Sequence, residues 1–173
     1  MSQRDWSLRL ARVSDAELMP AIEAAAGEMF AEIDGIGSAG THTLPIEKLT
    51  RYIRKGHSLV AHVDETLVGF LVNEPFSREL HVWEMDVHPA FQGRGIGAGL
   101  LRACQIDARN SGYSAITLTT FRDVPWNGPF YTRLGFEEVT ALDAHPRLAS
   151  ELALEADHGL PMNRRCAMIH FID

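Results

Sequence analysis

A glycine-rich stretch lies in the middle of the chain: Gln92-Gly93-Arg94-Gly95-Ile96-Gly97-Ala98, followed by a fourth glycine at position 99. A strand pattern ends before it at Val87, and a helix pattern follows it to about Asn110. The glycines remove side chains where the backbone enters the helix, so successive N–H groups can point at one anion. The helix dipole adds about 0.3–1 kcal/mol per charge. We interpret the stretch as a phosphate-binding turn, with a plain tight turn as the alternative.

Two common nucleotide-binding signatures fit this turn poorly. The P-loop signature fails because no Lys followed by Ser or Thr comes after the glycines. The dinucleotide signature is met only in relaxed form by Gly93-x-Gly95-x-x-Ala98, and no acidic residue stands near Tyr113, about 20 residues on. Residues 88–92 also separate the strand from the glycines. A nicotinamide enzyme is therefore disfavoured.

Composition predicts one globular domain over residues 1–173. Of its residues, 46% are hydrophobic and 23% are charged. Lys and Arg total 16 against 23 Asp and Glu, a net charge of −7 that disfavours nucleic acid as a partner and weakly favours cationic substrates such as amines.

Hydropathy and cysteine usage predict a soluble, cytoplasmic protein without a membrane partner. No apolar run approaches the ~20 residues that a membrane span needs. Cys104 and Cys166 stand far apart and form no Cys-x-x-Cys pair, so neither a disulfide framework nor a zinc knuckle is indicated. We expect both thiols to be reduced and buried.

Hydrophobic periodicity predicts a mixed, partly antiparallel sheet in which hairpins come first and crossover helices later. The first helix, from residue 14, is expected to bury Leu18, Ile22, Ala25 and Met29. Further helices are expected from residue 45, from the glycine turn to 110, and from Asn127 to Gly135. Residues 143–163 are expected to form a loop with one or two helical turns. The predicted strands are 8–11, 58–63, 67–72, 81–87, 115–119, 138–140 and 166–171.

Two motifs resemble those of the GNAT superfamily of acyl-CoA-dependent N-acyltransferases. The first is Gln92-x-x-Gly95-x-Gly97, preceded by Val87-His88-Pro89, and the second is Tyr131-x-x-x-Gly135-Phe136. The resemblance implies an α/β (α+β) fold: a single GNAT-type domain with a mixed sheet of about six to seven strands, splayed between the fourth and fifth and flanked by helices. One departure is Val124, where the family often has Asn.

The resemblance also implies acetyl-CoA as co-substrate, no metal, and a set of cofactor-binding residues. Asn127 could reach the pantetheine arm in place of the missing Asn, or could be a plain helix cap. A backbone N–H beside Met85 is expected to bind the thioester carbonyl. The backbone of the fourth strand would bind pantetheine and the glycine turn the pyrophosphate, which gives the set Met85, Asp86, Val87, Gln92, Gly93, Arg94, Gly95, Ile96, Gly97, Ala98, Asn127 and Tyr131.

Two residues are candidates for proton transfer. An ammonium must lose a proton before or during attack, and Glu84 is the candidate base, with a water chain or a merely solvated Glu as alternatives. Tyr131 is the candidate donor to the departing CoA thiolate, with simple packing as its alternative.

Three other groups of residues have both a functional and a purely structural interpretation. A metal site at Glu84, Asp86 and His88, which alternate along one strand, is disfavoured against cofactor docking. Acidic residues near the first helix could attract a cation, but a solvated helix face is favoured; they are Glu23, Glu28, Glu32 and Asp34. Four aromatic residues could line an acceptor site or belong to the core, namely Trp83, Phe121, Trp126 and Phe130.

The predicted function is therefore N-acetyltransfer from acetyl-CoA to a primary amine, favoured to be that of a small molecule, by direct attack. The alternatives are acetylation of a protein N-terminus or lysine, and a CoA-binding module without turnover. The terminal strand 166–171 could form a homodimer, as in many relatives.

Overall fold

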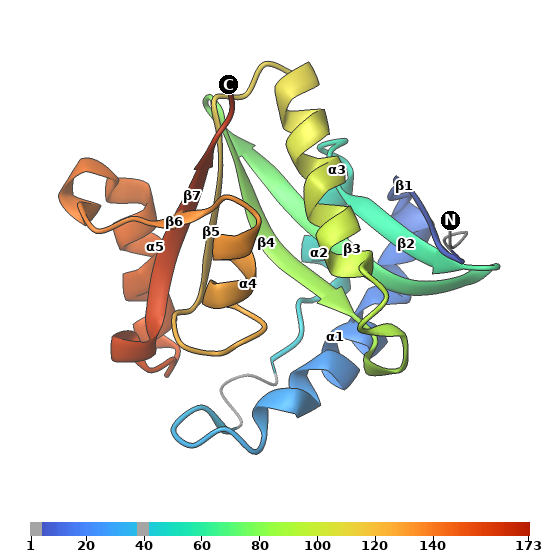
Figure 1. Ribbon diagram of the computed structural model, residues 1–173, viewed down its shortest axis with the longest axis horizontal. Helices are drawn as coiled ribbons and strands as arrows, with labels where there is room; N and C mark the ends of the chain where they lie inside the picture. The colour runs from blue at the N-terminus through green and yellow to red at the C-terminus, as the bar shows by residue number, and fades with distance from the viewer. Residues whose placement is uncertain (1–4, 38–41) are drawn as a thin grey trace.

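Seven strands of the described residues, 5–37 and 42–173, form one mixed sheet in the computed structural model (Figure 1). Its order is β1-β2-β3-β4-β5-β7-β6. The strands are β1 (Ser7–Leu10), β2 (Leu59–Val63), β3 (Thr66–Phe76), β4 (Glu79–Val87), β5 (Ala115–Phe121), β6 (Glu137–Glu138) and β7 (Arg165–Phe171). The α-helices are α1 (Met19–Gly27), α2 (Ile46–Ile53), α3 (Ile96–Asn110), α4 (Gly128–Arg133) and α5 (Pro146–Asp157). Every predicted strand is present.

The sheet splits between β4 and β5, as the family resemblance implied. These two strands pair in parallel only where Glu79–Val82 lies beside Ala115–Leu118, whereas the other strand pairs are antiparallel. Beyond that point the two strands diverge (Figure 1). A bulge lies at the same place, because Val72 pairs with Glu84 while Asn73 pairs with Val82, which leaves Trp83 as the extra residue. A bulge bends its strand and increases the local twist, so it helps to open the gap.

Helices cover both faces of the sheet. In Figure 1, α3 lies in front of the sheet and α1 and α2 lie behind it. The predicted stripe of α3 is buried and packs against Leu71 and Ile116; its residues are Leu100, Leu101, Cys104 and Ala108. Because side chains alternate along a strand, Phe70 faces the opposite side and packs against Leu49 and Tyr52 of α2.

The predicted buried face of the first helix was partly wrong. Ile22 is buried, but Leu18 is 54% exposed, and Met19 and Ala26 are buried in its place. A 3₁₀ turn at Val13–Glu17 precedes α1. The packing of α1 against β3 and β4 decides which face of the helix is buried.

Two element boundaries were also wrong. β3 continues through Pro75, which pairs with Leu80, although a break was expected there. β2 pairs with β3 only as far as Leu71, so Pro75 lies where β3 has a free edge that tolerates a missing N–H. The expected loop 143–163 contains the three-turn helix α5, held on the sheet by Leu148 and Leu152.

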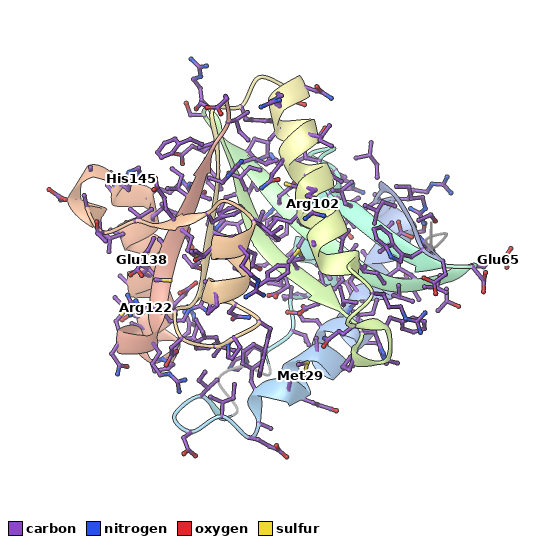
Figure 2. All side chains as sticks on the ribbon, viewed as in Figure 1. Met29, Glu65, Arg102, Arg122, Glu138 and His145 are labelled. Atoms are coloured by element: carbon purple, nitrogen blue, oxygen red, sulfur yellow. The ribbon has the colours of Figure 1, made fainter. Side chains whose placement is uncertain are left out.

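Ion pairs fix the periphery of the fold. Arg122, after β5, binds Glu138 of β6 at 2.8 Å, and the two side chains lie together in Figure 2, far from Glu65 at the β2–β3 turn.

Both cysteine thiols are free and buried, as predicted, and burial raises the pKa of the Cys104 thiol to about 12. No helix in the described parts of the chain is long and apolar enough to cross a bilayer.

Candidate active site

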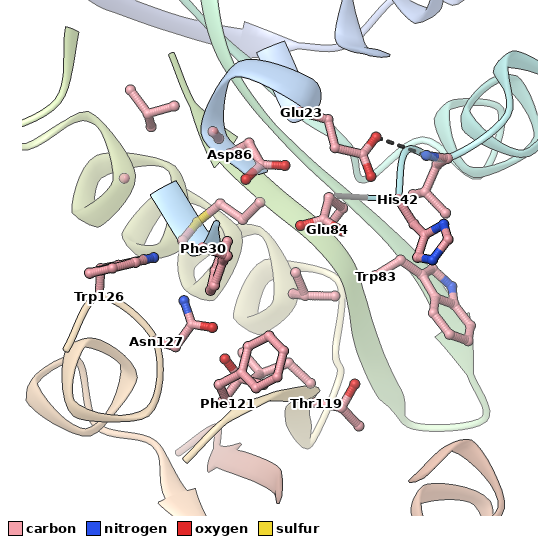
Figure 3. Close-up of a pocket in the computed structure, with 18 of the residues that line it drawn as sticks. Glu23, Phe30, His42, Trp83, Glu84, Asp86, Thr119, Phe121, Trp126 and Asn127 are labelled. Carbon is pink, nitrogen blue, oxygen red and sulfur yellow. Dashed lines mark hydrogen bonds between the residues drawn. The ribbon is translucent and has the colours of Figure 1, made fainter. Parts of the chain in front are cut away.

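A cavity of about 1090 Å³ opens where β4 and β5 diverge (Figure 3). On one face of the sheet it reaches the start of α3 and α4. On the other face it reaches α1, α2 and α5. The split in the sheet thus joins two binding areas, one on each face, through the same opening.

The open part of β4 presents alternating backbone groups to this cavity. His88 N donates to Val68 O at 2.8 Å, so the backbones of Asp86 and Glu84 also face β3. The backbones of Met85 and Val87 face the gap instead. Gln92 Nε2 donates to the Val87 carbonyl at 2.9 Å, which agrees with that orientation. The expectation that Asp86 exposes its backbone was therefore wrong, because the strand alternates; Asp86 contributes its side chain.

The glycine turn presents a row of free N–H groups. Gly93 and Gly95 adopt φ values of 77° and 81°, a region that favours glycine. The first backbone hydrogen bond of α3 runs from Gly99 N to Gly95 O at 2.9 Å. Within the described residues, no N–H group of 93–98 donates to another residue's oxygen. Such a row at a helix N-terminus suits an anion with several oxygens.

All but one of the predicted site residues line the cavity. The exception is Arg94, whose guanidinium pairs with Asp5 at 2.8 Å on the surface. Val124, at the place where the family often has Asn, is buried beside Phe121 and Ile36. Asn127 occupies the N-cap position of α4, but its side chain makes no capping hydrogen bond. The plain-cap interpretation is therefore wrong.

Three carboxylates meet beside the open strand. One oxygen from each of Glu23, Glu84 and Asp86 lies within 4.8 Å of the other two (Figure 3). Glu23 also accepts a hydrogen bond from Leu44 N at 2.9 Å. Asp86 Oδ2 is buried and has no hydrogen-bond partner among the described residues. We call Glu23, Glu84 and Asp86 the carboxylate cluster.

The sequence missed one member of this cluster. Glu23 was expected on a solvated helix face, yet it is 5% exposed, whereas Glu28, Glu32 and Asp34 are exposed as expected. His88, weighed as a partner of Glu84 and Asp86, uses its Nδ1 to accept from Ala90 N instead. Nothing in the local pattern marks Glu23, because the phase of α1 decides where it points.

Burial changes the protonation of all three groups. It raises the pKa of Glu23 from 4.5 to about 8, with the Glu84 charge adding to the shift and the Leu44 N–H opposing it. Burial also raises the pKa of Glu84. The pKa of Asp86 lies well above its ordinary value because of burial and the charges of Glu84 and Glu23. Glu23 therefore retains its proton at neutral pH, and the raised pKa values of all three groups suit the exchange of protons with a bound amine.

Tyr131 reaches the cavity from α4. It is 9% exposed, and burial together with the nearby Glu84 and Asp86 charges raises the pKa of its phenol. The hydroxyl is therefore neutral at physiological pH and can donate a proton or a hydrogen bond.

Aromatic side chains form the walls of the cavity, and all four weighed above line it. Phe30 lies with its ring centroid 5.5 Å from that of Phe121 and 5.5 Å from that of Trp126. Trp83 stacks on Tyr52 at 5.7 Å. The surroundings of the carboxylate cluster are therefore largely apolar.

Comparison with known proteins agrees with this geometry. The model of the acetyltransferase (GNAT) domain matches residues 54–138. PaiA N-acetyltransferase from Thermoplasma acidophilum, in complex with coenzyme A, is similar at a TM-score of 0.73 and 18% identity, over 96% of this chain and 98% of that chain. The ribosomal-protein-S18-alanine N-acetyltransferase from Escherichia coli is similar at 0.69 and 14%, over 97% and 94%. N-acetylglutamate synthase from Neisseria gonorrhoeae, complexed with coenzyme A and N-acetyl-glutamate, is similar at 0.70 and 18%, over 97% of this chain and 35% of that chain.

A split mixed sheet, a glycine turn with free N–H groups beside the split and the match to the GNAT domain together define an acyltransferase that uses CoA as the acyl carrier. The chain belongs to the GNAT superfamily of acetyltransferases. The predicted family, fold class, enzyme class and cofactor are thereby confirmed.

Replacement of Glu23 tests the protonation of the cluster. The folded state holds this proton more tightly than the unfolded chain, since the pKa is raised from 4.5 to about 8. The free energy of unfolding should therefore fall as the pH rises through that range. In Glu23→Gln part of this fall is absent, and the variant becomes more stable than the wild type at the alkaline end.

Urea unfolding at about pH 5 and about pH 8.5 measures the difference. Glu28→Gln, at an exposed position just after α1, is the matched control and should follow the wild type. If Glu23→Gln shows the wild-type pH dependence, the proposed protonation of the cluster is wrong.

Proposed function

We propose that the protein transfers the acetyl group of acetyl-CoA to the primary amine of a small molecule, with Glu84 as base and Tyr131 as acid. The observation that carries this proposal is the carboxylate cluster, which shares one cavity with the free N–H groups of the glycine turn. An amine held by the cluster would lie beside the open β4 strand, along which the thioester would extend.

The cofactor would bind mainly to backbone groups. The pyrophosphate would accept hydrogen bonds from N–H groups of residues 93–98, and pantetheine would lie along the open edge of β4 as an added strand does. The Met85 N–H, which faces the gap, would bind the thioester carbonyl and stabilise its negative charge during attack. Asn127, whose side chain is not used as a cap, would contact the pantetheine arm.

The reaction needs two proton transfers. The amine enters as an ammonium and passes one proton to Glu84, directly or through a water. Its nitrogen then forms a bond to the thioester carbon, the carbon–sulfur bond breaks, and the CoA thiolate takes a proton from Tyr131. The second ammonium proton replaces the one lost by Tyr131, and the proton on Glu84 leaves to solvent. The products are the N-acetylated amine, the CoA thiol and one proton, and no covalent enzyme intermediate is formed.

The shape of the acceptor side favours a small molecule. Phe30, following α1, packs against Phe121 and Trp126, so the N-terminal and C-terminal halves meet across the split. The carboxylate cluster lines the same cavity, with Glu23 buried and Glu84 and Asp86 half-buried. A protein N-terminus or lysine would have to pass the aromatic wall, which makes protein acetylation the second choice.

The proposal also includes a cytoplasmic location and a homodimer. Two buried free thiols suit a reducing compartment. β6 pairs with Ile169 and Met168, and Val139 N donates to Ala167 O, so part of the outer edge of β7 is already occupied. A dimer through this strand would use the remaining edge.

An acceptor screen tests the proposed function. Release of free CoA thiol from acetyl-CoA should occur with small primary amines and not with their N-acetylated or quaternary analogues, because attack needs a free amine. Release with peptides alone would establish protein acetylation instead. Binding of CoA without thiol release from any amine or peptide would establish a CoA-binding module and refute the proposal.

Replacement of Glu84 tests the base. Glu84→Gln should lower kcat roughly 10²-fold or more. Its side chain faces the acceptor while its backbone faces β3, so the Kd for CoA should stay as in the wild type. Because burial raises the pKa of Glu84, the wild-type kcat should fall as the pH drops toward that pKa, and the variant should lose this limb. An unchanged pH profile of kcat in the variant would assign the base elsewhere.

Replacement of Tyr131 tests the acid. Tyr131→Phe keeps the ring in its packed position but removes the proton donor, so turnover should fall by about tenfold or more while CoA binding changes little. Steady-state kinetics together with calorimetric CoA binding separate the two effects. Turnover equal to that of the wild type would limit Tyr131 to packing.

A further inference from the structure

The segment just before β1 holds the glycine turn from outside the cavity. Trp6 Nε1 donates to the carbonyl oxygen of Arg94 at 3.0 Å. Asp5 Oδ2 accepts from the Arg94 guanidinium at 2.8 Å. None of the three residues is among those that line the cavity. The turn is therefore fastened by residues that do not themselves face the cofactor side.

The indole ring of Trp6 also explains why residue 99 is a glycine. A Cβ atom at Gly99 would lie 2.4 Å from Cη2 of Trp6, closer than Cβ atoms approach other heavy atoms. Gly99 belongs to the first turn of α3, where its N–H donates to Gly95 O at 2.9 Å. The ring thus rests directly on the backbone that begins the helix. Trp6 and a side chain at position 99 exclude each other.

The peptide between Arg94 and Gly95 connects the Trp6 hydrogen bond to the cavity. In a trans peptide the C=O and the following N–H point in opposite directions, and the described residues contain no cis peptide. Because the Arg94 carbonyl points to Trp6, the N–H of Gly95 points away from Trp6. Gly95 lines the cavity, so this is the side on which an anion would bind. A rotated 94–95 peptide would turn a carbonyl oxygen toward the anion instead.

We propose that Trp6 is a positioning residue for the cofactor: its indole N–H fixes the 94–95 peptide so that the Gly95 N–H meets the pyrophosphate of acetyl-CoA. This inference rests on the proposed binding of CoA at the glycine turn. The Asp5–Arg94 pair has a lesser part, since its side chains are 60% and 41% exposed and such pairs add little stability.

Trp6→Phe is the main variant, because it removes the N–H donor and keeps an aromatic side chain, although the shorter side chain also gives up part of the contact with Gly99. The Kd for CoA, measured by calorimetry, should rise about two- to tenfold, as expected for one hydrogen bond. The melting temperature should stay near that of the wild type. With S-acetylpantetheine, a substrate that lacks the pyrophosphate, kcat/KM should be unchanged. A purely structural role would lower turnover with both substrates.

Gly99→Ala gives an independent test from the other side of the contact. The added methyl group must displace the Trp6 ring, so the Kd for CoA should rise although position 99 does not line the cavity. In a Trp6→Ala background the space is free, and adding Gly99→Ala should raise the Kd no further. Additive effects of the two substitutions would overturn the proposed contact.

Three other outcomes would overturn the inference. Trp6→Phe could bind CoA as tightly as the wild type, or lose activity equally with S-acetylpantetheine. Asp5→Asn, which removes only the ion pair, could weaken binding as much as Trp6→Phe and so assign the effect to the Arg94 side chain. A wild type that fails to bind CoA at all would refute the proposed function itself, which distinguishes that failure from a failure of Trp6 alone.

Discussion

The end of pairing between β4 and β5 is the constraint on which the rest of the site depends. After Val82 and Leu118 the two strands share no ladder, and the bulge at Trp83 bends β4 at that point. A strand without a neighbour leaves N–H and C=O groups unpaired, which is unfavourable unless a ligand or water satisfies them. The fold is therefore built around backbone groups that a strand-like ligand can complete, and the pantetheine arm of CoA has amides suited to that purpose.

The carboxylate cluster is a second place where the folded chain leaves polar groups that a ligand can satisfy. Burial disfavours the charged form of each carboxylate and raises the pKa values of Glu23, Glu84 and Asp86, and repulsion within the cluster adds to the shifts of Glu23 and Asp86. A cation would relieve this repulsion and allow the cluster to ionise. Recognition of an ammonium group and acceptance of its proton thus depend on the same three side chains.

How much the sequence predicts depends on the range of the interaction that decides each feature. The position of the glycine turn at the start of α3, the buried stripe of α3 and the splayed sheet follow from local pattern or from the family motifs, and they are confirmed. Anion binding by the turn stays a prediction. Glu23 was missed because the packing of α1 against β3 and β4 decides its buried face, and α5 was missed because only Leu148 and Leu152 mark its buried face. The contact of Trp6 with Arg94 joins residues 88 positions apart, and no local pattern encodes it.

The distribution of charge around the cavity explains why the cluster suits a cation. Glu155, on the opposite wall, binds Arg165 through two contacts of 3.0 Å and a shared contact with Thr119. That carboxylate is already neutralised by a cation held in fixed geometry. The three carboxylates of the cluster have no such partner among the described residues, and Asp86 Oδ2 lacks even a hydrogen-bond donor. In the proposed reaction an amine would therefore be bound by the cluster, beside the open edge of β4.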